Sequence, residues 1–244
     1  MSPIHRLRSR RVELVPMTPL QQLRAGQLGR RLVQLGVGLW LYGASMAMMV
    51  RAALGLDPWD VLHYGVQLHW GVSFGTVVIV TGVLVLLLWI PLRQWPGLGT
   101  VANTVVIGLA TDATLWMLPG HSSLVVRAAL LLVGIVLNGL AGALYIGSQF
   151  GPGPRDGLMT GLARRTGWSL RVVRTGIELS ALGVGWLLGG TVGVGTVVYA
   201  LLIGPTVQLF LPMVTVRLAA PAPQGSAPSG PLHLDGVDAP HPAQ

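Results

Sequence analysis

The stretch Gly55-Leu56-Asp57-Pro58-Trp59-Asp60 organises this chain, because it returns as Gly151-Pro152-Gly153-Pro154-Arg155-Asp156. Both copies follow a long apolar segment. Both place a proline and, two residues later, an aspartate at the head of a short amphipathic stretch. The offset between the two aspartates is 96 residues, and the same offset aligns much of the chain with itself.

Further matches at this ungapped offset pair Arg31 with Arg127, Gly43 with Gly139, Gly97-Leu98-Gly99-Thr100 with Gly193-Val194-Gly195-Thr196, and Ile107-Gly108 with Ile203-Gly204. Apolar matches arise by chance in so biased a composition. Shared Pro-x-Asp and Gly-x-Gly-Thr patterns in one register do not arise so easily. The chain therefore contains an internal repeat.

Composition indicates a membrane protein. Of the 244 residues, 52% are hydrophobic and only 10% are charged, and the mean hydropathy is +0.65. Apolar runs of near 20 residues match the ~30 Å hydrocarbon core of a bilayer at ~1.5 Å per residue. A soluble chain would leave too much apolar surface in water. We expect an all-α polytopic membrane protein whose main partner is the lipid bilayer.

The apolar pattern predicts six spans, at about residues 32–50, 74–92, 98–118, 124–146, 170–188 and 195–214. Residues 59–70 are too short to cross, since twelve residues of helix cover only ~18 Å. The second copy of the motif, Gly151–Asp156, is likewise followed by a short helical stretch that ends at about Thr166. Each predicts a short re-entrant or interfacial helix.

Four regions follow from this pattern: a basic cytoplasmic tail (1–30), a first membrane repeat (31–120), a second repeat (121–215) and a cytoplasmic tail (216–244). The last region is rich in Pro, Ala, Gly and Ser, a composition that predicts disorder.

Each half holds an odd number of spans, so the two halves enter the bilayer in opposite orientations, as inverted repeats do. Arginine placement supports this. All 16 cationic residues are arginine, and with the N-terminus inside only Arg51 and Arg127 fall outside. The positive-inside rule therefore predicts that both termini are cytoplasmic.

Asp60 and Asp156 are the first candidate site residues. In one interpretation they only start helices, because a proline at the first helical position and an aspartate in the first turn suit a helix N-terminus. In the other, two half-helix N-termini meet near the midplane and bind an anion, a cation or a proton. Gly55, Pro58, Gly151, Pro154 and Arg155 complete this half-helix motif.

Three further candidates lie within predicted spans. A carboxylate there costs at least ~2.5–3.5 kcal/mol on insertion scales, which makes Asp112 and Glu178 functional candidates. Asp112 corresponds to Gln208 at the repeat offset, so both halves place a polar side chain at one depth. Glu178 lies one turn after Arg174, and an internal ion pair is the simpler explanation for it.

Other functions have little support in the sequence. The arginines flank apolar segments, which argues against nucleic-acid binding. The chain has no cysteine, and its histidines have no metal-ligand spacing, so we expect neither metal nor cofactor. No nucleophile motif or phosphate loop is present, so we do not expect an enzyme.

The paired motifs resemble those of the YczE-type bacterial membrane proteins, relatives of the broader YitT-like group. The residues that carry the resemblance are 54–62, 151–160 and Arg174-Thr175-Gly176-Ile177-Glu178, and it extends over about residues 30–215. The resemblance implies a multi-pass protein of the bacterial inner membrane. It supplies no activity and no catalytic residues.

Two functions remain open. The first is a small transporter or channel-like permease for an unknown small solute or ion, with its path between the repeats. A homodimer is compatible with this function. The second is a non-transporting membrane partner that regulates or stabilises another membrane-associated complex.

Overall fold

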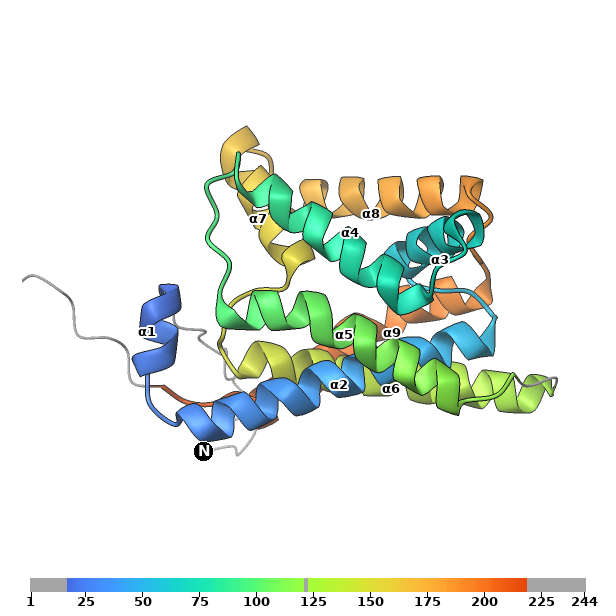
Figure 1. Cartoon of the computed structure of the whole chain (residues 1–244), viewed down its shortest axis with the longest axis horizontal. Coiled ribbons are helices and arrows are strands. Elements are labelled where there is room, and N and C mark those ends of the chain that lie inside the picture. The colour runs from blue at the N-terminus through green and yellow to red at the C-terminus, as the bar shows by residue number, and fades with distance from the viewer. Residues whose placement is uncertain (1–16, 121–122, 219–244) are drawn as a thin grey trace, which may run out of the picture.

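The computed structural model describes residues 17–120 and 123–218, and these form nine helices and no strand (Figure 1). In chain order the helices are α1 (Pro19–Arg24), α2 (Leu28–Ala52), α3 (Pro58–Trp70), α4 (Phe74–Trp89), α5 (Leu98–Met117), α6 (Leu124–Gly147), α7 (Pro154–Thr166), α8 (Leu170–Leu187) and α9 (Val194–Val214). Most of both predicted tails, residues 1–16 and 219–244, lies outside the described residues. Within the predicted N-terminal tail, α1 and the first residues of α2 are helical, which the sequence analysis did not predict.

The helices are arranged in two layers (Figure 1). In one layer α2 packs against both α5 and α6, and α9 packs against α6. In the other layer the shorter helices pair, α3 with α8 and α4 with α7. The main core lies along α2 and α6, where Leu39, Met46 and Ile135 are buried. Helix α4 also packs on α5 and so joins the two layers.

Within the described residues, four helices are long and apolar enough to cross a membrane: α2, α5, α6 and α9, of 20 to 25 residues each. Helices α3 and α4 qualify as a fifth span only when taken together, and they are bent by 114° at the break between them. Of the six predicted spans, α4 has only 16 residues, and α8 carries Arg171, Arg174 and Glu178. Length and charge therefore leave four or five candidate spans.

The second half of the chain repeats the helix order of the first. Each helix from α6 to α9 begins 96 residues after its counterpart: Leu28 and Leu124, Pro58 and Pro154, Phe74 and Leu170, Leu98 and Val194. The offset found in the sequence is therefore also the offset between helix starts.

The loops before the two short helices dock on the opposite half. The N–H of Gly99, in the first turn of α5, donates to the carbonyl of Phe150 at 2.9 Å. At positions 96 residues away, the N–H of Gly195 in α9 donates to Leu54 at 2.8 Å. In the first loop Gly55 has a φ of +119°, and a Cβ there would lie 2.7 Å from the backbone nitrogen of Gly193. Only glycine fits this turn.

Two equivalent arginines bind these loops from the opposite half. Arg31 in α2 is fully buried, and its guanidinium donates to the carbonyls of Ser148 and Gln149 at 2.8 and 2.9 Å, and to that of Gln22. Arg127 in α6 donates to Ala52 and Ala53, which precede Ser148 and Gln149 by the repeat offset. In the sequence, Arg31 is only one of the arginines that indicate topology. The structure gives it a buried role at the end of α6.

Small residues allow close helix contacts at α7. A Cβ on Gly157 would lie 1.9 Å from Cζ2 of Trp89 in α4, so the two helices touch here without room for a side chain. The Trp89 indole also donates to the Pro154 carbonyl at 3.0 Å. Gly153, Gly157 and Gly161 recur every four residues, a spacing that favours close packing of one helix face, and at Gly157 this face packs on α4.

Replacing Arg31 by methionine is expected to destabilise the protein more than replacing Arg127. Arg31→Met leaves three carbonyls without their donor, and each unsatisfied buried group costs about 1–3 kcal/mol. Arg127 is less buried and serves two carbonyls. Thermal unfolding in detergent measures both losses. Equal losses in the two variants would contradict the assigned role of Arg31.

Gly157→Ala is expected to lower the free energy of unfolding by about 1–3 kcal/mol, because the added methyl group meets the Trp89 ring. Gly176→Ala in α8 is the matched control, since nothing lies within 4 Å of a Cβ at that position. That control is expected to be neutral or slightly stabilising. The same unfolding measurement tests both variants.

Candidate functional site

Two short helices begin close together inside the protein. Helices α3 and α7 have 13 residues each and start with a proline. Their N-termini are in contact, because the guanidinium carbon of Arg155 lies 5.6 Å from the ring centroid of Trp59. From there α7 and α3 run toward opposite ends of the molecule (Figure 1). The start of α3 is buried at Trp59, Asp60 and Val61, whereas its end is exposed at Leu68 and Trp70.

The residue that caps α3 is Asp57. Its carboxylate accepts hydrogen bonds from the N–H groups of Trp59 and Asp60 at 2.9 and 3.1 Å. The equivalent residue before α7 is Gly153, which has no side chain to cap with. Asp60 and Asp156 lie in the first helical turns, as the sequence predicted.

A cavity of about 420 Å³ lies where the two short helices meet. Both halves of the chain line it. Its polar and aromatic lining comprises Tyr42, Asp57, Trp59, Asn103, Asn138, Tyr145, Arg155, Asp156, Arg174, Glu178, Tyr199 and Gln208. Three of the five candidate residues from the sequence analysis, Asp156, Glu178 and Gln208, are therefore brought together.

The two arginines of the cavity each contact a carboxylate. Arg155 donates to the hydroxyl of Tyr42 at 2.9 Å, and its guanidinium lies 3.8 Å from Asp57. Arg174 donates to Glu178 at 2.9 Å. The ion pair between Arg174 and Glu178, which their spacing predicted, is confirmed.

Tyrosine hydroxyls hold the other polar groups of the cavity. The hydroxyl of Tyr145 donates to Asp156 at 2.9 Å. That of Tyr199 donates to the side-chain oxygen of Asn138 at 3.1 Å, and the amide of Asn138 in turn donates to Ser45. The lining is thus held in place by contacts between α2, α6, α7 and α9.

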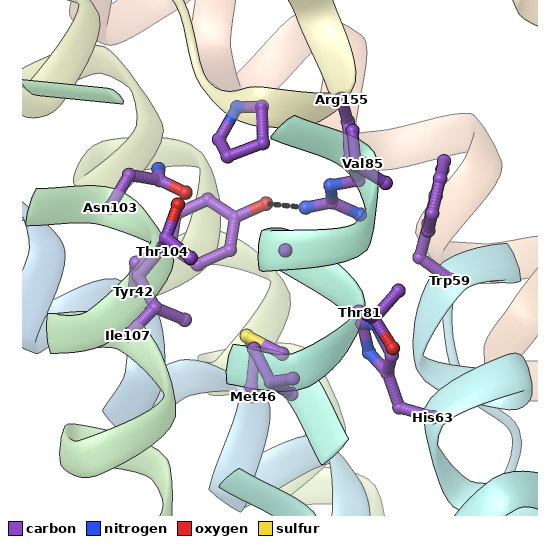
Figure 2. A pocket seen from close by; sticks show the side chains of 13 residues that line it. Tyr42, Met46, Trp59, His63, Thr81, Val85, Asn103, Thr104, Ile107 and Arg155 are labelled. Atoms are coloured by element: carbon purple, nitrogen blue, oxygen red, sulfur yellow. Dashed lines mark hydrogen bonds between the residues drawn. The ribbon is translucent and has the colours of Figure 1, made fainter. Parts of the chain in front are cut away.

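Asp60 is not among the residues that line this cavity. It is fully buried, and its carboxylate lies 3.1 Å from Nδ1 of His63 on the same helix. His63 faces a second cavity of about 40 Å³, which shares Tyr42, Trp59 and Arg155 with the larger one. Figure 2 shows this smaller cavity, with the Tyr42 hydroxyl directed at the guanidinium of Arg155. Asp60 and Asp156 thus occupy different environments despite their equivalent positions.

Asp112 also lies outside the described lining of both cavities. Its carboxylate accepts hydrogen bonds from the N–H of Gly75 at 2.7 Å and from the hydroxyl of Ser73. Asp112 therefore holds the N-terminus of α4 against α5, which is a structural contact. Its counterpart Gln208 does line the larger cavity.

Eight of the polar and aromatic residues that line the cavity are not among the candidates from the sequence, and four of these are Asp57, Tyr42, Tyr145 and Tyr199. Asp57 could have been found, because an aspartate directly before a proline at the first helical position is a typical N-cap. The tyrosines carry a weaker signal. Tyr42 lies in the interior of α2, whereas tyrosines of an interfacial belt lie near span ends. Tyr145 lies in the last turn of α6, where a belt tyrosine is equally expected.

The fold and the cavity define the protein as an all-helical, multi-pass membrane protein. The chain belongs to the family described as "Family of unknown function (DUF6198)", which matches residues 29–212. It is 34% identical over 178 residues to the "Uncharacterized membrane protein YczE" of Bacillus subtilis, covering 72% of this chain and 82% of that protein. The predicted resemblance to YczE-type proteins is confirmed.

Two other relatives are similar over a comparable length. An "Uncharacterized protein" of Haemophilus influenzae is 40% identical over 173 residues, which cover 71% of this chain and 79% of the relative. The "Uncharacterized protein YyaS" of Bacillus subtilis is 25% identical over 186 residues, covering 73% and 91%. No solved structure gives a significant match to the chain.

Asp57→Ala is expected to lower the free energy of unfolding by about 1 kcal/mol or more, since α3 loses its cap and Arg155 loses its carboxylate. Asp57→Asn keeps an oxygen that can accept from Trp59 and Asp60, so it is expected to be less destabilised. Thermal unfolding of both variants measures the difference. If the asparagine variant were as unstable as the alanine variant, the capping role would be wrong.

Proposed function

We propose that the protein is a small permease of the bacterial inner membrane, with a solute path between its two halves. The observation that supports this is the cavity of about 420 Å³, lined by charged and polar side chains from both halves of a strongly apolar protein. Ionisable groups inside a membrane protein are costly, and they mark solute or ion paths.

The proposed architecture has six spans, in which α2, α4 and α5 are related to α6, α8 and α9 by inversion across the membrane. The common offset of the helix starts and the reciprocal Arg31 and Arg127 contacts support it. Even numbers of spans place both termini on one side. In agreement, Gln34 near the start of α2 donates to the carbonyl of Val214 at the end of α9. The arginine distribution favours the cytoplasm as that side.

The two halves differ in how their last helices pack, and this difference supports an alternating path. In the first half, a Cβ on Gly108 of α5 would lie 2.5 Å from the Gly75 carbonyl of α4. In the second half, nothing lies within 4 Å of a Cβ on the equivalent Gly204 of α9. Helices α4 and α5 are therefore in close contact at this position, which we call closed. Helices α8 and α9 are not in contact at the equivalent position.

Asp112 is central to the closed pair, because it binds Ser73 and Gly75. The equivalent Gln208 borders the cavity instead. In the proposed cycle α8 closes on α9, which brings Ser169 to Gln208, while α4 separates from α5. The cavity then opens toward the other side of the membrane, as expected for two inverted repeats that exchange conformations.

Paired cysteines test this cycle, and the chain has no natural cysteine to interfere. Ser73→Cys with Asp112→Cys is expected to form a disulfide rapidly, because these side chains already touch. Ser169→Cys with Gln208→Cys is expected to form one more slowly, only when α8 closes on α9. Gel mobility under mild oxidation measures both rates. A second pair that never forms a disulfide would contradict the cycle.

Transport itself is measured with liposomes that contain the protein and a mixture of small cations, anions and neutral metabolites. Mass spectrometry is expected to show selective loss of at least one solute. Oxidised Ser169→Cys/Gln208→Cys protein is the matched control; it should block that loss, and a reductant should restore it. If no solute escapes, the non-transporting membrane partner replaces the permease as the better proposal.

A further inference from the structure

The charges that line the large cavity are unequal, with two arginines and three carboxylates. Arg155 lies 3.8 Å from Asp57, and Arg174 donates to Glu178 at 2.9 Å. Asp156 belongs to none of the ion pairs between the described residues. The contact of its carboxylate is the neutral hydroxyl of Tyr145. One negative charge in the cavity therefore has no cation beside it.

Neighbouring arginines do not fill this position. Arg155 precedes Asp156 on α7, and successive side chains of a helix do not face each other. Accordingly Arg155 reaches Tyr42, Asp57 and Trp59. Arg174 acts electrostatically on Asp156 from a longer distance, but its hydrogen bond goes to Glu178. The carboxylate of Asp156 thus has a hydrogen bond from Tyr145 but no ion-pair partner among the described residues.

Two helix N-termini face the same region, and each carries about half a positive charge. These partial positive charges favour an anion, but the protein's own carboxylates already lie beside them. Asp57 caps α3, and Asp156 lies in the first turn of α7. Asp60 adds a further, fully buried carboxylate in the first turn of α3. The formal balance of the region stays negative, which favours a cation.

Aromatic rings supply the rest of the site. The chain has four tyrosines, and three of them, Tyr42, Tyr145 and Tyr199, line this cavity together with Trp59. Because the Tyr145 hydroxyl donates to Asp156, the ring of Tyr145 lies beside the carboxylate that has no ion-pair partner. Aromatic faces attract ammonium groups as well as apolar carbon. The protein already uses this interaction here, since Arg155 lies over Trp59.

We propose that the large cavity binds an organic cation, whose ammonium group pairs with Asp156 while its apolar part contacts Tyr145 and Tyr199. This inference rests on the proposed permease function, because it names the class of solute for the same cavity. The cavity volume suits a small organic molecule, since ligand sites commonly enclose about 300–1,000 Å³.

Choline is the probe for this site, and its neutral carbon isostere, in which a tert-butyl group replaces trimethylammonium, is the matched control ligand. The full chain in lipid nanodiscs is titrated with each compound, and the shift in melting temperature gives Kd. Choline is expected to stabilise the protein and the isostere is not. Benzoate, an organic anion, is titrated in the same way. Equal stabilisation by choline and its isostere, or stabilisation by benzoate alone, overturns the proposal.

Two variants of Asp156 refine the test. Asp156→Asn is expected to raise the Kd for choline by about tenfold to a hundredfold, the usual worth of a charged hydrogen bond. Asp156→Glu keeps the charge and is expected to retain most of the affinity. The melting temperature without ligand shows whether each variant is folded. A folded Asp156→Asn variant that binds choline like the unaltered protein overturns the proposal.

Measurements of choline binding and of solute transport test the cation site and the permease function separately, although the first inference rests on the second. Choline binding without movement of any solute would leave the cation site in place and count against transport. Transport of anions alone, with no choline binding, would preserve the permease and reject the cation site.

Discussion

The structure depends on one exchange of hydrogen bonds between its halves. The chain leaves α2 and α6 in loops whose backbone groups are buried, and buried carbonyls need donors, above all away from water. Arg31 supplies donors to the end of α6, and Arg127 supplies them to the end of α2. The N-termini of α5 and α9 complete each loop. Neither half can satisfy its own loop, so the two halves fold as one unit.

This exchange also explains where the polar cavity lies. Because each loop is held by the opposite half, the helix that follows it begins near the interface of the halves. Helices α3 and α7 therefore start side by side, with Arg155 against Trp59 and Asp57. The side chains in the first turn of α7 meet residues of α2 and α6 there, namely Tyr42 and Tyr145. The fold thus produces a polar centre from stretches that are distant in sequence.

Much of the fold could be predicted from the sequence, because the signals are strong and local. Proline followed by aspartate marks the starts of α3 and α7, and one ungapped offset relates all the main helix starts. The side-chain environments were harder to predict. Asp60 and Asp156 look identical in the repeat, yet only Asp156 lines the large cavity, whereas Asp60 is fully buried beside His63. Asp112 looks like an intramembrane site and instead binds Ser73 and Gly75. Such differences depend on which side chains meet across helices, and periodicity does not contain that information.

The departures from the repeat are where the two halves acquire different chemistry. Asp60 has His63 one turn later, whereas the residue one turn after Asp156 is Met159, which offers no such partner. Asp57 is replaced by Gly153, so the start of α7 has no capping carboxylate. Asp156 is the acidic residue in its first turn. Asp112 is replaced by Gln208, so the contact that closes α4 on α5 has no charged equivalent between α8 and α9. A symmetric backbone alone would present the same charges from both sides. The first half thus contributes Asp57 to the cavity wall, where it lies beside Arg155, whereas the second half contributes Asp156, which belongs to no ion pair between the described residues.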